Sequence, residues 1–261
     1  MDFQTFYEEF ENRGMVEFAR RYKAAKDKKR FLNIFFVSKR NWDSWTSESP
    51  VLPLQYSGIY GMGTYSIVFR VIDGKGDEYA FKMTTRDEET ESDLKVHVHL
   101  AQVGLAPTIY LSCYTKGILC LVMDPIKTSL REMSGHIDTS AFIRFLERKA
   151  RAGFVHGDMH ASNIVLLKSG EFGLIDFDYS FFSPPFHTLD FIPLIGSLRH
   201  LSRLTGLREF VKDYCLTRHC MDIEDSEFGD PTQGYSYRGL TSYARFHGFK
   251  ALNKAFPNIK L

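Results

Sequence analysis

The segment at residues 156–167, HGDMHASNIVLL, restricts the possible folds more than any other stretch of this chain. Its last four residues form an apolar run that suits a buried β-strand. The residues in front of that run include two histidines, a glycine, an aspartate and an asparagine, which a buried strand does not explain. Polar side chains are costly to bury unless they find partners. The pattern therefore predicts a loop with a chemical role that leads directly into a strand.

Length and composition indicate a folded globular protein. The chain has 261 residues, which is enough for one large domain or two smaller lobes with a substantial core. Hydrophobic residues make up 44% and charged residues 25%, so disorder is not expected. The formal net charge is +1, so no overall field attracts nucleic acid or an anionic membrane.

The cysteines and the distribution of apolar residues favour a cytoplasmic protein. Four cysteines do not make a disulfide framework in a chain this long. Cys215, His219 and Cys220 resemble half of a metal site, but no second Cys/His pair at ligand spacing accompanies them, so ordinary thiols are favoured. The N-terminal sequence lacks an apolar signal core, and no stretch approaches 18 apolar residues. We expect a cytoplasmic protein, or one that passes to the nucleus, with no membrane partner.

The first 50 residues predict a helical extension followed by a linker. Aromatic residues at spacings of three and four predict a helix over residues 1–30. Seven lysines or arginines lie between Arg20 and Arg30. A solvated helix face explains this cluster better than a nucleic-acid site, which the cluster nevertheless leaves open. Residues 41–56 are polar and contain two prolines, as is typical of a linker.

Residues 55–124 predict a sheet with one helix. Two pairs of apolar segments flank short turns and predict antiparallel strands: residues 67–72 with 79–83, and residues 109–114 with 118–123. Between the pairs, Val96, Leu100 and Val103 predict one face of a helix. Gly104 and Pro107 are expected to end that helix.

From residue 128 on, the pattern becomes mainly helical. An amphipathic helix is expected to end near Gly153, and residues 172–176 are expected to pair with the strand at residues 164–167. Further helices are predicted at residues 188–219 and 238–256. The predicted fold class is α+β, with an antiparallel sheet and one main helix followed by a mostly helical part.

Gly61, Gly63 and Lys82 suggest a place for phosphate. Glycines between strands let backbone N–H groups approach phosphate oxygens. Lys82 stands in the apolar strand sequence Tyr-Ala-Phe-Lys-Met, where a lysine is costly to bury unless it meets an anion. If the odd-numbered neighbours face away, Ala80 and Lys82 face one cleft together. Nucleotide phosphates would be a sufficient partner; the alternative is an edge-strand lysine that reaches water.

Asp158, Asn163 and Asp176 suggest a magnesium site next to a base. Asn163 follows Asp158 by five residues, and Asp176 follows it by 18. Each stands at the edge of a predicted strand, so the three side chains could converge. Hard oxygen ligands suit Mg²⁺, which shares its coordination shell with substrate phosphates. The remaining carboxylate could accept a hydroxyl proton while the metal neutralises the transferring group.

Taken in order, these motifs resemble the protein-kinase-like superfamily over residues 55–200. The resemblance implies ATP and Mg²⁺ as cofactors and a bilobal kinase-like fold. It implies an N-terminal lobe at residues 51–124 and a C-terminal lobe at residues 125–261, after the extension at residues 1–50.

The resemblance also implies a role for individual residues. The residues that would bind ATP are Gly61, Gly63, Ser66 (in place of a third glycine), Val68, Ala80, Lys82, Met123 (the gatekeeper) and the backbone of Asp124 and Ile126. Asp158 would be the catalytic base, while Asn163 and Asp176 would hold the metal. His156 and Asp190 would support the catalytic loop, although a plain helix cap explains Asp190 about as well. Asp93 is favoured over Glu89 and Glu91 as the acidic partner of Lys82.

Two departures from the pattern bear on the phosphate acceptor. His160, a candidate catalytic residue, stands where serine/threonine kinases usually carry lysine, and Asp178 replaces a glycine. The spelling H-G-D-x-H-x-x-N is similar to that of aminoglycoside and choline kinases and of some atypical protein kinases. The predicted activity is that of a compact atypical serine/threonine protein kinase with a protein substrate. The alternatives are a kinase for a small-molecule alcohol and a pseudokinase scaffold.

Overall fold

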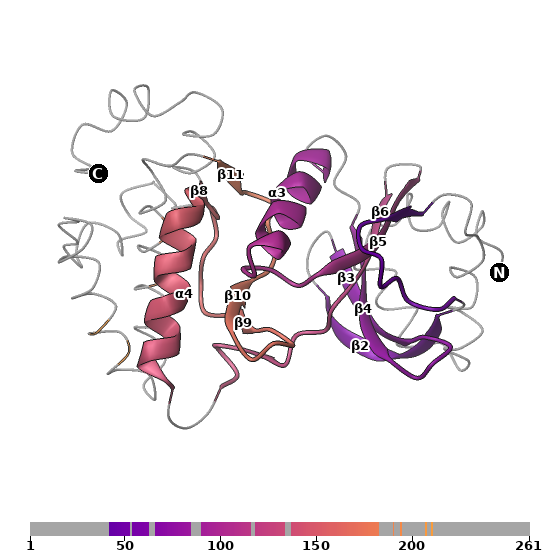
Figure 1. The fold of residues 1–261 in the computed structure, drawn as a ribbon, viewed down its shortest axis with the longest axis horizontal. Coiled ribbons are helices and arrows are strands. Elements are labelled where there is room, and N and C mark those ends of the chain that lie inside the picture. The colour runs from indigo at the N-terminus through magenta and orange to yellow at the C-terminus, as the bar shows by residue number, and fades with distance from the viewer. Residues whose placement is uncertain are drawn as a thin grey trace. The chain divides into compact units, whose positions relative to one another are not determined.

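The computed structural model describes residues 42–52, 54–62, 66–84, 90–115, 118–133 and 137–182, together with positions 190, 194, 207 and 210. The chain divides into two compact units (Figure 1). The sheet unit comprises residues 1–90 and 108–125, and the loop unit comprises residues 91–107 and 126–261. The helices predicted at residues 1–30 and 238–256, and most of the one at residues 188–219, lie outside the described residues, as do Cys215 and Cys220. The predicted lobe boundaries at residues 50 and 124 stay a prediction.

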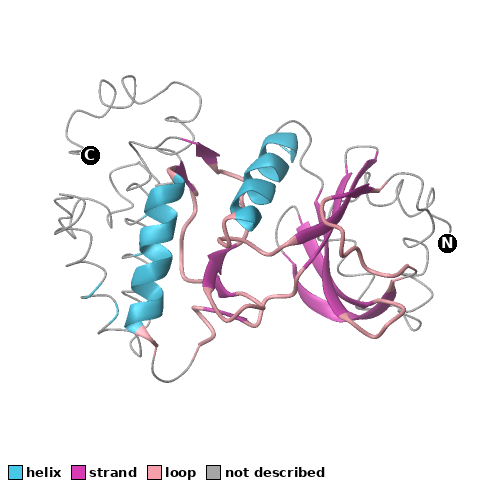
Figure 2. Cartoon of the chain, in the orientation of Figure 1, coloured by secondary structure: helices cyan, strands magenta, loops and turns pink. Residues whose placement is uncertain are grey.

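The sheet unit contains a six-stranded sheet in which every neighbouring pair is antiparallel (Figure 2). The order across the sheet is β1-β5-β6-β4-β3-β2. The bounds are β1 Asp43–Ser44, β2 Gln55–Met62, β3 Ser66–Ile72, β4 Glu78–Thr84, β5 Ile109–Thr115 and β6 Ile118–Met123. The four predicted strands of this region are confirmed as β3 to β6.

Alternation of side chains builds the core of the sheet unit on one face of the sheet. In β3, Ile67, Phe69 and Val71 are buried, whereas Arg70 is exposed. The rings of Phe69 and Phe81 stack with centroids 6.2 Å apart. Because successive residues of a strand point to opposite faces, the core fixes which residues lie on the other face.

Asp73 organises the turn between β3 and β4. Its Oδ1 accepts the backbone N–H groups of Lys75 at 2.8 Å and Asp77 at 3.0 Å, while Oδ2 accepts that of Val51 at 3.1 Å. Burial alone would raise the pKa of Asp73, but these three hydrogen bonds and the charge of Lys75 hold it below its ordinary value. The tight turn predicted here is confirmed, with Gly76 at a φ of +93°.

The loop unit combines two helices with small antiparallel sheets in the described part of the chain. Helix α3 spans Thr90–Gln102 and α4 spans Thr139–Ala152. One sheet has the order β10-β9-β7 and the other pairs β11 with β8. The strand bounds are β7 Thr128–Ser129, β8 Phe154–Val155, β9 Ile164–Leu166, β10 Phe172–Leu174 and β11 Phe181–Phe182. The predicted pairing of residues 164–167 with residues 172–176 is confirmed as β9 and β10.

Helix α4 has capping residues at both ends. The Asp138 carboxylate accepts the N–H groups of Ser140 and Ala141, and Gly153 ends the helix at a φ of +63°. The predicted end of this helix near Gly153 is therefore confirmed. Neither described helix is long and apolar enough to cross a lipid bilayer.

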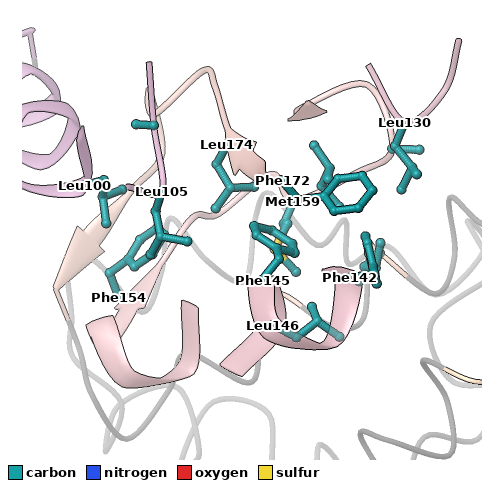
Figure 3. Packing of buried hydrophobic residues seen from close by; sticks show 14 of the residues in the cluster. Leu100, Leu105, Leu130, Phe142, Phe145, Leu146, Phe154, Met159, Phe172 and Leu174 are labelled. Carbon is teal, nitrogen blue, oxygen red and sulfur yellow. The ribbon is translucent and has the colours of Figure 1, made fainter. Parts of the chain in front are cut away.

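The core of the loop unit lies between α4, α3 and the β9–β10 hairpin (Figure 3). Phe142 and Phe145 of α4 pack against Phe172 of β10, with ring centroids 5.2 and 6.3 Å apart. From α3, Val96 and Leu100 are buried as expected. Val103 was expected on the same face, and this is wrong: α3 ends at Gln102, and Val103 lies beyond it with its side chain exposed.

Candidate active site

One row of residues crosses the sheet of the sheet unit. Lys82 of β4 lies opposite Val68 of β3, which in turn lies opposite Gly61 of β2. On its other side Lys82 is paired with Leu121 of β6. Side chains directly opposite each other in antiparallel strands point to the same face. The register therefore brings Gly61, Val68 and Lys82 together on one face of the sheet.

The same face carries more of the residues expected to bind ATP. Tyr79, Phe81 and Met83 point into the core of the sheet unit, so Ala80 and Lys82 lie on the opposite face, which we call the Lys82 face. Ala80 is paired there with Met123. Ser66 lies at the start of β3, opposite Thr84. Gly63 lies outside the described residues.

Asp124, the first residue after β6, is hydrogen-bonded through both its backbone N–H and its side chain. The N–H of Asp124 donates to the carbonyl of Thr108 at 2.9 Å, so the backbone group of Asp124 that could pair with adenine is its carbonyl. The Asp124 carboxylate accepts the hydroxyl of Tyr110 at 2.9 Å. Burial, followed by the charge of Asp124, raises the pKa of Tyr110, which therefore remains a hydrogen-bond donor. Ile126 begins the following segment, in the loop unit.

In the loop unit, residues 156–163 form the predicted loop, and it is held from within. The N–H of His160 donates to the carbonyl of Asp158, and the N–H of Asn163 donates to the carbonyl of His160, both at 2.9 Å. The side-chain Nδ2 of Asn163 donates to the carbonyl of Asp158 at 3.0 Å. Because a carbonyl only accepts, this bond assigns the amide nitrogen to the loop and leaves Oδ1 as the ligand atom.

Asp158 and His160 form a second pair within this loop. The Asp158 side chain is largely buried, and its Oδ2 lies 3.6 Å from Nε2 of His160. That separation suits an ion pair but is longer than a normal hydrogen bond. Nδ1 of His160 accepts the N–H of Ser162 at 3.2 Å. In the neutral ring the proton therefore sits on Nε2, the nitrogen that faces Asp158.

His156 is fully buried and held as a neutral ring. Its Nε2 lies 2.9 Å from the carbonyl of Ile175, and its Nδ1 accepts the N–H of Asp158 at 3.2 Å. The carbonyl requires a proton on Nε2, and the N–H requires a lone pair on Nδ1. Burial lowers the pKa of His156 in spite of nearby charges, chiefly that of Asp190, that act in the opposite direction. His156 thus supports the loop as a fixed, uncharged connector.

Asp190 holds the start of the loop with its carboxylate. Oδ2 accepts the N–H of His156 at 2.6 Å, and Oδ1 accepts the N–H of Gly157 at 2.9 Å. Lys149 of α4 places its Nζ 2.6 Å from Oδ2, and both side chains are fully buried. Burial alone would raise the pKa of Asp190, but the charge of Lys149 and these hydrogen bonds hold it below its ordinary value.

Asp176 follows β10 in an unusual backbone conformation. Its φ is +67°, a region that few residues other than glycine adopt, although aspartate is enriched there. Such conformations persist where the surroundings hold them, and they cluster at functional sites. The N–H of the preceding Ile175 donates to the carbonyl of Asn163 at 3.0 Å. The segment that carries Asp176 is therefore tied to the 156–163 loop.

Three contacts of the site were missed by reasoning from the sequence. Phe177 packs against the rings of His97 and His156, at 4.9 and 5.4 Å between centroids. Gly157 has a φ of +83°, and a Cβ at this position would lie 2.5 Å from the carbonyl oxygen of Tyr179. Lys149 was read only as part of an amphipathic helix. A glycine directly before Asp158 was the one available signal of a close approach.

The donor set fits Mg²⁺. Asn163 presents Oδ1, and Asp176 supplies a half-buried carboxylate, both of them hard oxygen ligands. Among the residues that the structure describes, no group of three or more His, Cys, Asp or Glu side chains is arranged to hold a metal ion. Mg²⁺ bound with a nucleotide takes one or two protein carboxylates and completes its shell with water and phosphate oxygens.

Some of the predicted contacts join residues of different units. Lys82 lies on β4 of the sheet unit, whereas Asp93 lies half-buried on α3, and Asp158 and Asp176 lie in the loop unit. The pairing of Lys82 with Asp93 and the meeting of Lys82 with the aspartates stay predictions.

A model of the phosphotransferase enzyme family matches residues 121–222 of this chain, which is less than half of its length. The matched segment contains the 156–163 loop, Asp176 and Asp190. This family belongs to the protein-kinase-like superfamily, so the resemblance stated from the sequence is confirmed. The match supports the prediction that this protein is a phosphotransferase enzyme. A search of the curated proteins gave no match.

Proposed function

We propose that this protein is an ATP- and Mg²⁺-dependent kinase that transfers the γ-phosphate of ATP to a hydroxyl group. The observation that carries the proposal is the buried pair of Asp158 and Asn163, fixed by one hydrogen bond inside the segment matched by the phosphotransferase family. Phosphoryl transfer needs positioning and charge neutralisation rather than covalent chemistry. The fixed pair suits the positioning, and Lys82 and a metal ion held by Asn163 and Asp176 would supply the neutralisation.

Each site residue then has a definite task. Lys82 contacts the α- and β-phosphates of ATP from the Lys82 face of the sheet. Asp158 accepts the proton of the acceptor hydroxyl, and His160 lies beside it with Nε2 3.6 Å from the carboxylate. Asn163 and Asp176 hold Mg²⁺. When bound, the metal neutralises charge on the phosphates.

The first candidate acceptor is a serine or threonine hydroxyl of a protein substrate. Support comes from the upstream half of the chain, where the strand lysine and the sequence Leu-Val-Met-Asp-Pro-Ile at residues 121–126 resemble protein kinases. This proposal makes the protein a compact atypical serine/threonine kinase.

The second candidate acceptor is a small-molecule alcohol. His160 and Asp178 favour it, because this spelling of the loop is shared with aminoglycoside and choline kinases. A third alternative, a scaffold without transfer activity, is motivated by Ser66 in place of a glycine. Fold likeness alone does not choose among the three.

The test supplies labelled ATP and Mg²⁺ with generic protein acceptors, and separately with amino alcohols and sugars. We expect label on protein hydroxyls and a loss of roughly 10²–10⁴-fold in kcat for Asp158→Asn, which removes the base. Asp176→Asn should abolish the Mg²⁺-dependent transfer. Asp77→Asn, on the exposed hairpin turn of the sheet unit, is the matched control and should leave kcat unchanged.

Each alternative has its own outcome in the same experiment. Label that reaches only small molecules replaces the protein-kinase proposal with the small-molecule one. A rise in melting temperature with ATP, but no transfer to any acceptor, would support the scaffold.

A further inference from the structure

Lys149 is a lysine in a place where an apolar residue would be expected. It lies on α4 among the buried residues Phe142, Phe145 and Leu146, and its own side chain is fully buried. Its Nζ lies 5.3 Å from the centroid of the Phe154 ring. Removing an ammonium group from water is expensive, and an apolar side chain of similar size often stabilises a core as well or better. The charge of Lys149 therefore calls for a reason other than packing.

The reason lies in what its partner does. The carboxylate of Asp190 accepts two consecutive backbone N–H groups, those of His156 and Gly157, one on each oxygen. An ionised carboxylate is a strong acceptor at both oxygens, whereas in a protonated carboxyl one oxygen carries an O–H that must donate and is a poor acceptor. A buried carboxylate stays ionised only when a cation or several donors offset the loss of water. Lys149, at 2.6 Å from Oδ2, is that cation.

We propose that Lys149 is a positioning residue for phosphoryl transfer, an inference that rests on the proposed function. Its charge keeps Asp190 ionised, Asp190 then holds the N–H groups of His156 and Gly157, and these residues fix the backbone directly before Asp158. The Lys149 side chain is fully buried against Asp190, so its place is behind the loop rather than at an accessible substrate site. It acts at a distance, by setting where the base stands.

The first test replaces the charge and keeps the volume. Lys149→Met should lower kcat by roughly tenfold to hundredfold, because a small displacement of the base is costly, and should change KM for ATP by less than about twofold. Amide hydrogen exchange at His156 and Gly157 should accelerate. Lys95→Met, at an exposed position on α3, makes the same chemical change and should alter none of these quantities.

A second variant separates positioning from stability. In Lys149→Met combined with Asp190→Asn neither side chain of the pair carries a charge, so the melting temperature should recover relative to Lys149→Met alone. An asparagine oxygen accepts only one of the two N–H groups, and its amide nitrogen faces the other, so kcat should stay low. Lys149→Arg, which keeps the charge, should retain more of the wild-type kcat than Lys149→Met does.

Three results would overturn the inference. One is a Lys149→Met protein with wild-type kcat and wild-type exchange at His156 and Gly157. Another is a double variant that regains both stability and kcat, which would make Lys149 structural only. If Lys149→Met does not fold, the comparison of Lys149→Arg and the double variant with wild type still decides, and equal kcat in all three contradicts the proposal.

The exchange measurement keeps this inference distinct from the proposed function. It needs no acceptor and no transfer. A wild-type protein that transfers phosphate to nothing would end the proposed function. Faster exchange at His156 and Gly157 in Lys149→Met would still establish that the buried charge holds the loop.

Discussion

The two units position their candidate site residues by different physical means. On the Lys82 face, residues are aligned by strand register, and the opposite face is fixed in place by an apolar core. In the 156–163 loop, residues are aligned by hydrogen bonds to buried polar groups, one of which, Asp190, lies 34 residues from His156 along the chain. A register tolerates a change in one of its exposed side chains. A polar network does not, because each group that loses its partner is left buried and unsatisfied.

The strongest way to break the loop is to fill the space beside Gly157. Gly157→Ala places a Cβ 2.5 Å from a backbone oxygen of Tyr179 and adds the strain of a φ of +83°. We expect the free energy of unfolding to fall by about 3–5 kcal/mol and any remaining folded enzyme to lose most of its kcat. Urea unfolding and a transfer assay measure the two effects.

Gly170→Ala is the matched control for this substitution. Gly170 lies in the same unit with a φ of +91°, but its Cβ would meet only the end of the Lys127 side chain, at 3.8 Å. The expected cost is only the backbone strain, about 1–2 kcal/mol. Equal losses for the two variants would mean that the close approach to Tyr179 contributes nothing.

Two neighbouring residues of β4, which lie on opposite faces of the sheet, test the comparison in the sheet unit. Phe81→Ala removes a buried ring that packs on Phe69 and Trp42, at 6.2 Å between centroids in each case, and should cost about 3–5 kcal/mol. Lys82→Met lies on the other face and should change the free energy of unfolding by less than about 1 kcal/mol. It should weaken ATP binding by roughly tenfold to hundredfold, because it removes a charged donor.

Two measurements check this pair. Thermal unfolding without ligand reports the cost of Phe81→Ala, and the rise in melting temperature with ATP reports the loss in Lys82→Met. A Lys82→Met protein that binds ATP like the wild type would contradict the assignment of the Lys82 face to the nucleotide.

The same contrast explains how much was predictable from the sequence. The strands of the sheet unit could be predicted because side-chain alternation and turn residues are local signals. The turn that begins at Asp73 showed where β3 ends and where β4 begins. The β9–β10 pairing was predictable for the same reason. Val103 was misplaced because periodicity does not show where a helix ends.

The polar network of the loop unit was not predictable in this way. Asp190 could be read as a brace or as a helix cap, and Lys149 matched an amphipathic pattern that hides a buried charge. The ion pair between Lys149 and Asp190 joins residues that no local pattern connects. Only the fold brings them together, so the residues that position Asp158 are found from the structure rather than from spacing.

The turn at Asp73 is a small polar network inside the sheet unit, and it offers a milder test. Asp73→Ala leaves the N–H groups of Val51, Lys75 and Asp77 without their acceptor. We expect a loss of about 1–3 kcal/mol in the free energy of unfolding. Asp77→Ala, on the same turn but exposed, should cost less than about 0.5 kcal/mol. Equal costs would show that the carboxylate of Asp73 does not organise the turn.

The stability of the two units should respond to acid at different pH values. The pKa of His156 is lowered from 6.5 by burial, so below about pH 6.5 the unfolded chain binds a proton that the folded loop unit excludes. The resulting loss is at most about 1.4 kcal/mol per pH unit. Asp73 in the sheet unit has a pKa lowered from 3.8, and its contribution is therefore lost only below about pH 4.

Both tryptophans, Trp42 and Trp45, lie in the sheet unit, so their fluorescence in urea reports the unfolding of that unit. Hydrogen exchange of the α4 amides, corrected for the intrinsic exchange rate, reports the stability of the loop unit. Between about pH 7.5 and 5.5 we expect the α4 amides to lose protection in the wild type, and the tryptophan midpoint to move less. In His156→Gln, which cannot take up the proton, this pH dependence should largely vanish. If it persists unchanged, the neutral ring of His156 is not what makes the loop unit sensitive to acid.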